Sequence, residues 1–162
     1  MSETKNESYE LDIEQYQFER ACTGYGIEIY GATPKIRKSI VEEKFQEPLT
    51  IIDCSEIDTY DEYVNKCLSQ LGSSEQTIEK AWSSAADIRR ELNEKKGSFV
   101  LLEFDSLDLE VRKTVAQSMK GVAEGLDFDH IMIGFTSESG GEVVHANFDL
   151  SGRVQSAEAV DK

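Results

Sequence analysis

The sequence has few of the residues that build metal sites, disulfide frameworks or membrane spans. It contains three cysteines, an odd number at unrelated spacings, and two histidines: Cys22, Cys54, Cys67, His130 and His145. The small number and irregular spacing of these residues argue against a disulfide framework, a CxxC metal site and a zinc site, so no metal ligands are predicted. No apolar run is long enough to cross a bilayer, and no charged and then apolar leader opens the chain. We therefore expect a cytoplasmic protein without membrane contact.

Basic residues are scarce as well. The chain has 17 lysines and arginines against 32 aspartates and glutamates, which gives a formal net charge of −15. Such a surface repels nucleic acid over most of its area, so direct nucleic-acid binding is not expected. The acids are spread along the whole chain, as in a solvated acidic surface. A high-salt cytoplasm, as in halophilic archaea, and a plain need for solubility both produce this pattern.

The 162 residues are enough for one domain with a core of its own. Strand-like apolar segments alternate with helical patterns, and several of these segments are apolar on both faces. The expected strands are about four residues from Ile27 and the ranges 49–53, 98–105, 130–135 and 143–146. The expected helices cover 11–23, 34–45, 58–71, 75–95 and 107–125. This alternation predicts an α/β fold, a three-layer α/β/α sandwich with a mostly parallel five-stranded sheet. Residues 10–155 are expected to form it, between disordered ends at 1–9 and 156–162.

The segment 27–40 draws attention because its strand ends at a glycine and a helix follows at once. Thr33 and Pro34 form a helix start, with a side-chain acceptor at the N-cap and proline in the first helical position. Three cations, Lys35, Arg37 and Lys38, lie in the first turns of that helix. Ligands of such sheets bind beyond the carboxyl ends of the strands, and phosphate binds at helix N-termini. A solvated helix face is the alternative interpretation of the same cations.

Two nucleotide- or phosphate-related folds are rejected from the sequence. A dinucleotide-binding GxGxxG does not occur, because Gly24-Tyr25-Gly26 precedes the first strand instead of following it. A phosphoacceptor receiver needs a pair of acids after the first strand and a lysine after the last one. Here the first strand ends at Tyr30-Gly31, and no lysine follows Val144 in the required place.

A third possibility rests on a resemblance that covers roughly residues 25–155. IEIYGATPKIRKSI is similar to the strand-GxxxxGK[ST]-helix motif of P-loop ATPases, and FVLLEFDSLD resembles their second motif, where acids hold magnesium and polarise water. IMIGFTSES resembles the next strand, whose terminal polar residue senses the γ-phosphate, and ANFDLSGRV resembles the region that offers an arginine to a neighbour. Together these segments resemble the AAA+ branch of P-loop ATPases.

The resemblance implies a P-loop fold and, in an active member, ATP and magnesium as cofactors. The nucleotide-binding residues that it implies are Gly31, Lys35, Arg37, Lys38, Ser39 and Thr136. The catalytic residues that it implies are Glu103, Asp105 and Arg153.

The phosphate loop departs from the family pattern. Counted from Gly31, the second glycine falls on Ile36, the lysine on Arg37 and the magnesium-binding hydroxyl on Lys38. One extra residue in the loop restores Lys38-Ser39 as the Lys-Ser pair, yet Arg37 still replaces a glycine. Pro34 also removes an N–H group that such a loop would direct at phosphate.

The second motif departs too, because Leu102 stands where the pattern has aspartate, and an apolar side chain cannot organise magnesium. These departures predict a degenerate, non-hydrolysing relative that acts as a regulatory or protein-interaction module. Its expected partner is a protein, either an active ATPase or a second copy. Two alternatives stay open: a working ATPase that uses Lys38, Ser39 and Glu103 in a lengthened loop, and a scaffold whose ancestral site is filled in.

Overall fold

The fold is built on one mostly parallel sheet, which the computed structural model describes together with its helices over residues 9–72, 84–126 and 131–161. Its strand order is β1-β6-β2-β5-β4-β3. Only β1 is antiparallel to its neighbour, β6; the other pairs are parallel. The strands are β1 (Tyr9–Leu11), β2 (Ile27–Tyr30), β3 (Leu49–Asp53), β4 (Gly97–Leu102), β5 (Ile131–Ser137) and β6 (Gln155–Asp161). The prediction of a mixed α/β fold is confirmed, but the sheet has six strands instead of five.

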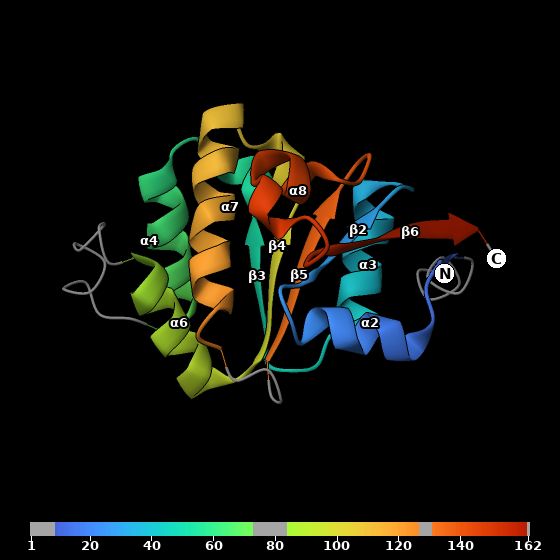
Figure 1. The fold of residues 1–162 in the computed structure, drawn as a ribbon, viewed down its shortest axis with the longest axis horizontal. Helices are drawn as coiled ribbons and strands as arrows, with labels where there is room; N and C mark the ends of the chain where they lie inside the picture. Colours follow the sequence, from blue (N-terminus) through green and yellow to red (C-terminus); the bar gives the residue numbers. More distant parts are fainter. Residues whose placement is uncertain (1–8, 73–83, 127–130, 162) are drawn as a thin grey trace.

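Helices cover both faces of this sheet (Figure 1). Side chains of α2 (Gln15–Cys22) and α3 (Pro34–Lys44) belong to the core on one face. The core on the other face contains side chains of α4 (Tyr60–Gln70), α6 (Ser84–Lys95), α7 (Leu109–Ala123) and α8 (Glu142–Ala146). Strand β4 supplies both cores, because Phe99 and Leu101 belong to one while Val100 and Leu102 belong to the other. The apolar run Phe99 to Leu102 thus faces a core on each side of the sheet, as its sequence indicated.

The position of β2 within the sheet bears on the alternative folds. It lies between β5 and β6, whereas β3, the next parallel strand along the chain, forms the far edge. In the dinucleotide-binding and receiver folds the first parallel strand lies beside the second. The observed order therefore agrees with the rejection of both.

The turn into α3 follows the expected N-cap chemistry. The Thr33 side chain accepts a hydrogen bond of 3.2 Å from the backbone N–H of Ile36, and Pro34 occupies the start of the helix. This cap fixes the helix directly beyond the end of β2. The first turn of α3 therefore lies at the carboxyl edge of the sheet.

The predicted fifth strand at 143–146 is wrong, since these residues belong to α8. Gly141 precedes this helix with a φ of 72°, in the left-handed region where glycine carries no Cβ penalty. The Glu28 carboxylate then accepts hydrogen bonds of 3.1 Å from the first two N–H groups of α8, those of Glu142 and Val143. A tertiary acceptor therefore overrides the strand propensity of two adjacent valines.

The ends of the chain also differ from expectation. The stretch predicted as a disordered tail is largely β6, in which Ala157 and Ala159 are buried. Small alternating apolar residues gave too weak a strand signal in the sequence. At the other end, Tyr9 to Leu11 form β1 and α2 begins only at Gln15. Residues 1–8, and 75–83 of the long helix predicted over 75–95, lie outside the described residues. The helices of the described ranges are all too short or too polar to span a bilayer.

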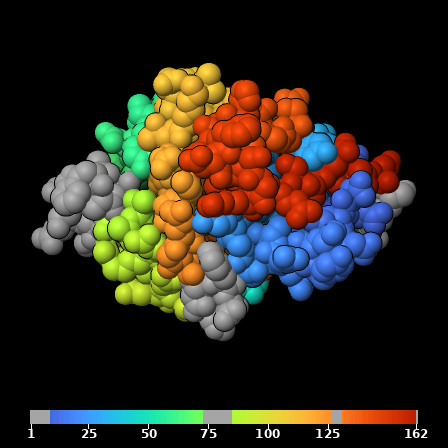
Figure 2. Space-filling view, in the orientation of Figure 1, coloured from blue at the N-terminus to red at the C-terminus, as the bar shows by residue number. Residues whose placement is uncertain are grey.

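One face of the molecule carries α7 together with the segment that follows β5. Figure 2 shows this segment, in red-orange, as a continuous part of the surface beside the orange and yellow residues of α7. Within it, Asn147 and Asp149 contact α7 through Gln117 and Lys120. The segment between β5 and β6 is thus fixed against the helix layer.

Candidate functional site

A pocket of about 270 Å³ opens at the carboxyl edge of the sheet. Segments that follow β2, β4 and β5 form it, which is the edge where the sequence placed a ligand site. Its lining residues are Ala32, Pro34, Arg37, Glu103, Asp105, Ser106 and Glu138.

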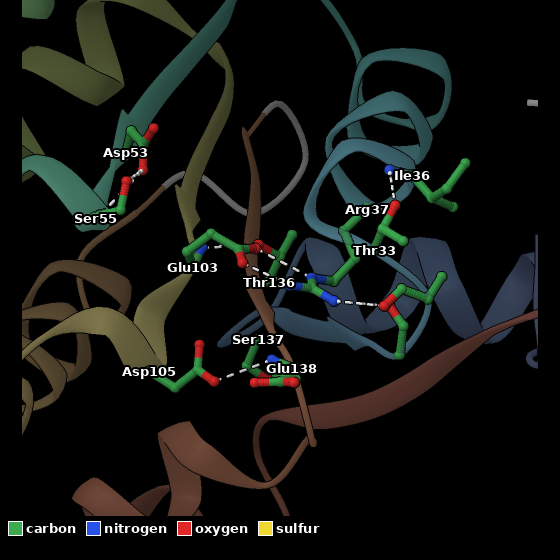
Figure 3. Close-up of polar contacts among 12 residues, drawn as sticks. Thr33, Ile36, Arg37, Asp53, Ser55, Glu103, Asp105, Thr136, Ser137 and Glu138 are labelled. Carbon is green, nitrogen blue, oxygen red and sulfur yellow. Dashed lines mark hydrogen bonds and ion pairs between the residues drawn. The ribbon is translucent and has the colours of Figure 1, made fainter.

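The Arg37 side chain lies inside this edge and is only 1% exposed (Figure 3). Its Nε donates to Oε2 of Glu103 at 3.0 Å, and its Nη2 donates to Oε1 at 2.6 Å. Such a two-pronged contact between guanidinium and carboxylate is among the stronger ion pairs in proteins. It joins the first turn of α3 to the residue that directly follows β4.

The same guanidinium is held by the turn after β2. Its Nη1 donates to the carbonyl oxygens of Gly31, at 2.9 Å, and Ala32, at 3.2 Å. The Gly31 N–H is directed elsewhere, to the carbonyl oxygen of Glu138 at 3.1 Å. A phosphate-binding loop works by directing successive N–H groups inward. Here carbonyl oxygens point inward, and they hold the chain's own cation.

Glu103 is fixed from the sheet side by Thr136 of β5. The Glu103 N–H donates to Thr136 Oγ1 at 2.8 Å, and the Thr136 hydroxyl donates to Glu103 Oε2 at 2.8 Å. Glu103 has a φ of 54°, a left-handed conformation that is unusual for a residue with a side chain. Because residues in such conformations cluster at functional sites, the strained Glu103 marks this position for attention.

A fully buried carboxylate, that of Glu28, lies on the α8 side of β2 and is completely inaccessible to solvent. It accepts hydrogen bonds from the Ser137 hydroxyl and from the N–H groups of Glu142 and Val143. Burial raises the pKa of Glu28, although these hydrogen bonds to its carboxylate partly oppose the shift. Glu28 was not among the predicted site residues, although an acid between two isoleucines in a buried strand is a signal for it.

Arg112 of α7 was also missed, and the sequence offers no signal for it beyond a cation near a helix start. Its Nη2 donates to the carbonyl oxygens of Asp105, at 3.0 Å, and Leu107, at 2.9 Å, and its Nη1 lies 3.3 Å from Oε1 of Glu142. It therefore ties the loop after β4 to the start of α8. Hydrogen bonds and ion pairs between side chains and backbone thus connect the loops around the pocket.

The predicted site residues divide into two groups. Gly31, Arg37, Glu103 and Thr136 come together in the contacts above. Asp105 lines the same pocket, where its Oδ2 accepts a hydrogen bond of 3.1 Å from the N–H of Glu138.

The other predicted residues do not line the pocket. Lys35 and Lys38 are exposed, and neither forms an ion pair within the described part of the chain. Ser39 is half-buried on α3. Arg153 lies at the amino edge of the sheet, where its guanidinium is stacked 5.0 Å from the centre of the Tyr25 ring. The structure thus separates Arg153 from the pocket of its own chain.

The residues present do not fit a triphosphate. Arg37, the cation of the pocket, is already paired with Glu103, and Asp105 and Glu138 add carboxylates to the lining. An anion would meet these oxygens together with the inward carbonyl groups of the Gly31–Ala32 turn. Within the described ranges, no group of three or more His, Cys, Asp or Glu side chains is arranged to hold a metal ion.

Comparison of the chain with protein-family models and with curated proteins gives no match to either. The site is therefore interpreted from its own geometry.

Proposed function

We propose that this protein is a degenerate AAA+-like P-loop protein that does not hydrolyse ATP and acts as a regulatory or protein-interaction module. One observation carries the proposal: the buried Arg37 guanidinium, in the segment that resembles the phosphate loop, binds both oxygens of Glu103. The protein's own ion pair thus lies between the two motifs that would face a bound nucleotide.

The arrangement of strands supports a P-loop origin. The three segments that follow β2, β4 and β5 are those that resemble the loop, the acids and the γ-phosphate sensor of the family. Because β5 lies between β2 and β4, Thr136 stands between the Gly31 turn and Glu103. A residue that senses a phosphate held between loop and acids must occupy such a position.

Two further features support the absence of hydrolysis. Leu102, at the position of the magnesium-binding aspartate, is 5% exposed and packs in the core on the α3 side. Glu103, at the position of the hydrolytic acid, is engaged by Arg37 and Thr136, so its carboxylate is not free to polarise a water molecule. Both acidic functions of the second motif are therefore lost.

A role in protein interaction follows from what remains at this edge. Internal ion pairs and hydrogen bonds join its loops, so no ligand is needed to connect them. A preordered surface loses less conformational entropy when a partner binds. The partner class that we propose is a protein, either an active ATPase or a second copy.

Phosphate release from ATP and magnesium by the purified chain tests the proposal. The expected result is the same background rate for the wild type and for Glu103→Gln, since no catalytic carboxylate is available to remove. Turnover by the wild type that Glu103→Gln abolishes would instead support the working ATPase.

A further inference from the structure

The buried carboxylate of Glu28 lacks a cation. Glu28 is completely inaccessible to solvent, and within the described part of the chain no cation acts on it. Its oxygens accept hydrogen bonds from the Ser137 hydroxyl and from the N–H groups of Glu142 and Val143, the latter two at 3.1 Å. A buried ionised carboxylate is normally paired with a cation, because its removal from water is costly. At Glu28 only neutral dipoles offset that cost.

The groups that face Glu28 add negative charge. Burial raises the pKa of Glu28 and the Glu142 carboxylate of α8 raises it further, while the three hydrogen bonds oppose the shift. Arg112 of α7 is directed to Glu142, with its Nη1 3.3 Å from Oε1. His145, near the other end of α8, is exposed. The residues paired with Glu28 in β5 and β6 do not titrate: Phe135 and Ser156.

Two glycines lie between β5 and α8. Gly140 and Gly141 have φ values of 80° and 72°, which glycine adopts freely. Loop residues of this kind absorb the backbone rotation in hinged motions. The other end of α8 is held separately, because the Asn147 side chain donates to Gln117 of α7 at 2.8 Å. The first turn of α8 can thus leave β2 while the end of the helix stays in place.

The protonation state of Glu28 decides how well this turn is held. A neutral carboxyl group can donate its proton to the Ser137 hydroxyl and still accept from the N–H groups of α8. An ionised group loses far more hydration when it is buried, and it regains that hydration when the turn moves away and water enters. Because burial raises the pKa of Glu28, closure of the turn weakens as the pH rises.

The same turn is connected to the pocket at the carboxyl edge of the sheet. Glu142 binds Arg112, whose Nη2 donates to the carbonyl oxygen of Asp105 at 3.0 Å. Asp105 and Glu138 line the pocket, and Oδ2 of Asp105 accepts from the N–H of Glu138 at 3.1 Å. Movement of Glu142 therefore removes a contact from the arginine that holds the loop of Asp105.

We propose that Glu28, Gly140, Gly141 and the first turn of α8 form a pH-dependent latch. With Glu28 neutral, the turn is closed against β2. With Glu28 ionised, the turn opens about the two glycines and withdraws Glu142 from Arg112. The latch is a regulatory device beside the pocket, and it requires neither a nucleotide nor a partner, so it does not depend on the proposed function.

Amide hydrogen exchange tests the latch, followed by NMR on the full chain at a series of pH values above the ordinary pKa of glutamate. The N–H groups of Glu142 and Val143 exchange when they leave Glu28. Glu28→Gln still accepts their hydrogen bonds but cannot ionise, and comparison at equal pH cancels the intrinsic pH dependence of exchange. Their protection in the wild type relative to Glu28→Gln should fall by up to about tenfold per pH unit, the limit for one proton. The matched control is Glu42→Gln, which replaces an exposed carboxylate and should keep a constant ratio to the wild type.

Low concentrations of urea distinguish the latch from unfolding of the whole chain. Local opening exposes little surface, so exchange at Glu142 and Val143 should hardly respond to urea. Exchange at the buried Ala116 and Met119 of α7 should accelerate instead. Equal urea dependence at all four sites, or a protection ratio that does not fall with pH, overturns the latch.

Ser137→Ala is a second variant, in which Glu28 can still ionise. It removes a hydrogen bond that lowers the pKa of Glu28, so the fall in protection should extend to higher pH. A fall that ends at lower pH than in the wild type would contradict Glu28 as the titrating group. Because no nucleotide is present in these measurements, their outcome is independent of the phosphate-release test of the proposed function.

Discussion

The Arg37 guanidinium and the Glu103 carboxylate meet through two hydrogen bonds, of 3.0 and 2.6 Å, although 66 positions separate them in the sequence. Their contact connects the turn after β2 with the end of β4. These are the two places where the resemblance to P-loop ATPases puts the phosphate loop and the magnesium-binding acids. In the function that we propose, this ion pair lies where an active relative would hold its nucleotide.

Replacement of Arg37 by alanine should destabilise the fold by about 3 kcal/mol, because one partner of a mostly buried ion pair is removed. Glu103 and the carbonyl oxygens of Gly31 and Ala32 would lose their donors. Arg37→Lys should cost less, since a charge remains, yet it should not restore wild-type stability because lysine lacks the planar fork. Urea denaturation measures both effects.

The matched control for Arg37 is Lys38→Ala, which removes an exposed cation from the adjacent position of the same helix. Its effect is expected to stay within about 0.5 kcal/mol. Equal losses for the two variants would show that the buried ion pair has no special role in stability.

Thr136→Val should lower the free energy of unfolding by about 2 kcal/mol, because it removes a hydroxyl that forms two hydrogen bonds with Glu103. The hydroxyl accepts from the Glu103 N–H and donates to the Glu103 carboxylate, and Thr136 is completely buried. Valine keeps the shape but leaves a buried N–H without a partner. Thr136→Ser keeps the hydroxyl and should lose markedly less stability in the same denaturation assay. A serine variant as unstable as the valine variant would assign the effect to packing.

Because of Glu28, the folded state should become less stable as the pH rises above the ordinary pKa of glutamate. Its pKa is raised in the folded state by burial. The folded chain therefore binds the proton of the Glu28 carboxyl group more tightly than the unfolded chain does. The free energy of unfolding then falls as the pH rises, until the pH has passed the raised pKa. Glu28→Gln cannot titrate, so the stability of the wild type relative to this variant should decrease over that pH interval.

The pH series needs a surface control, and Glu42→Gln on the exposed side of α3 provides it. Its difference from the wild type should stay within about 0.5 kcal/mol throughout. If the stability of the wild type relative to Glu28→Gln instead increased with pH, the pKa of Glu28 would be lowered in the folded state, which would contradict the account.

Much of the fold was predictable because its signals are local. The four consecutive apolar residues of β4 and the cap formed by Thr33 and Pro34 are visible in the sequence, and the structure confirms both. The meeting of Arg37 and Glu103 at one edge also follows from parallel strands, whose carboxyl ends lie together. The sequence did not indicate which of the three neighbouring cations would enter the site. That depends on which carbonyl groups the Gly31 turn directs inward.

Non-local contacts explain the errors. Val143 belongs to α8 since a buried glutamate more than a hundred positions earlier accepts from the start of that helix. Strand β6 is anchored by small residues, Ala157 and Ala159, whose apolar signal is weak in a polar segment. In both places the partner that decides the structure is distant in the sequence.

Thermal unfolding in the presence of increasing ATP and magnesium tests the central claim most directly, namely that the Arg37–Glu103 pair closes the ancestral phosphate site. A ligand at a hundred times its Kd would stabilise the chain by about 2.7 kcal/mol, so binding is readily detected. We predict that millimolar ATP leaves the unfolding temperature of the wild type unchanged. A clear rise that Lys38→Ala abolishes, and that Lys35→Ala does not, would contradict the account and establish a lengthened, functional phosphate loop.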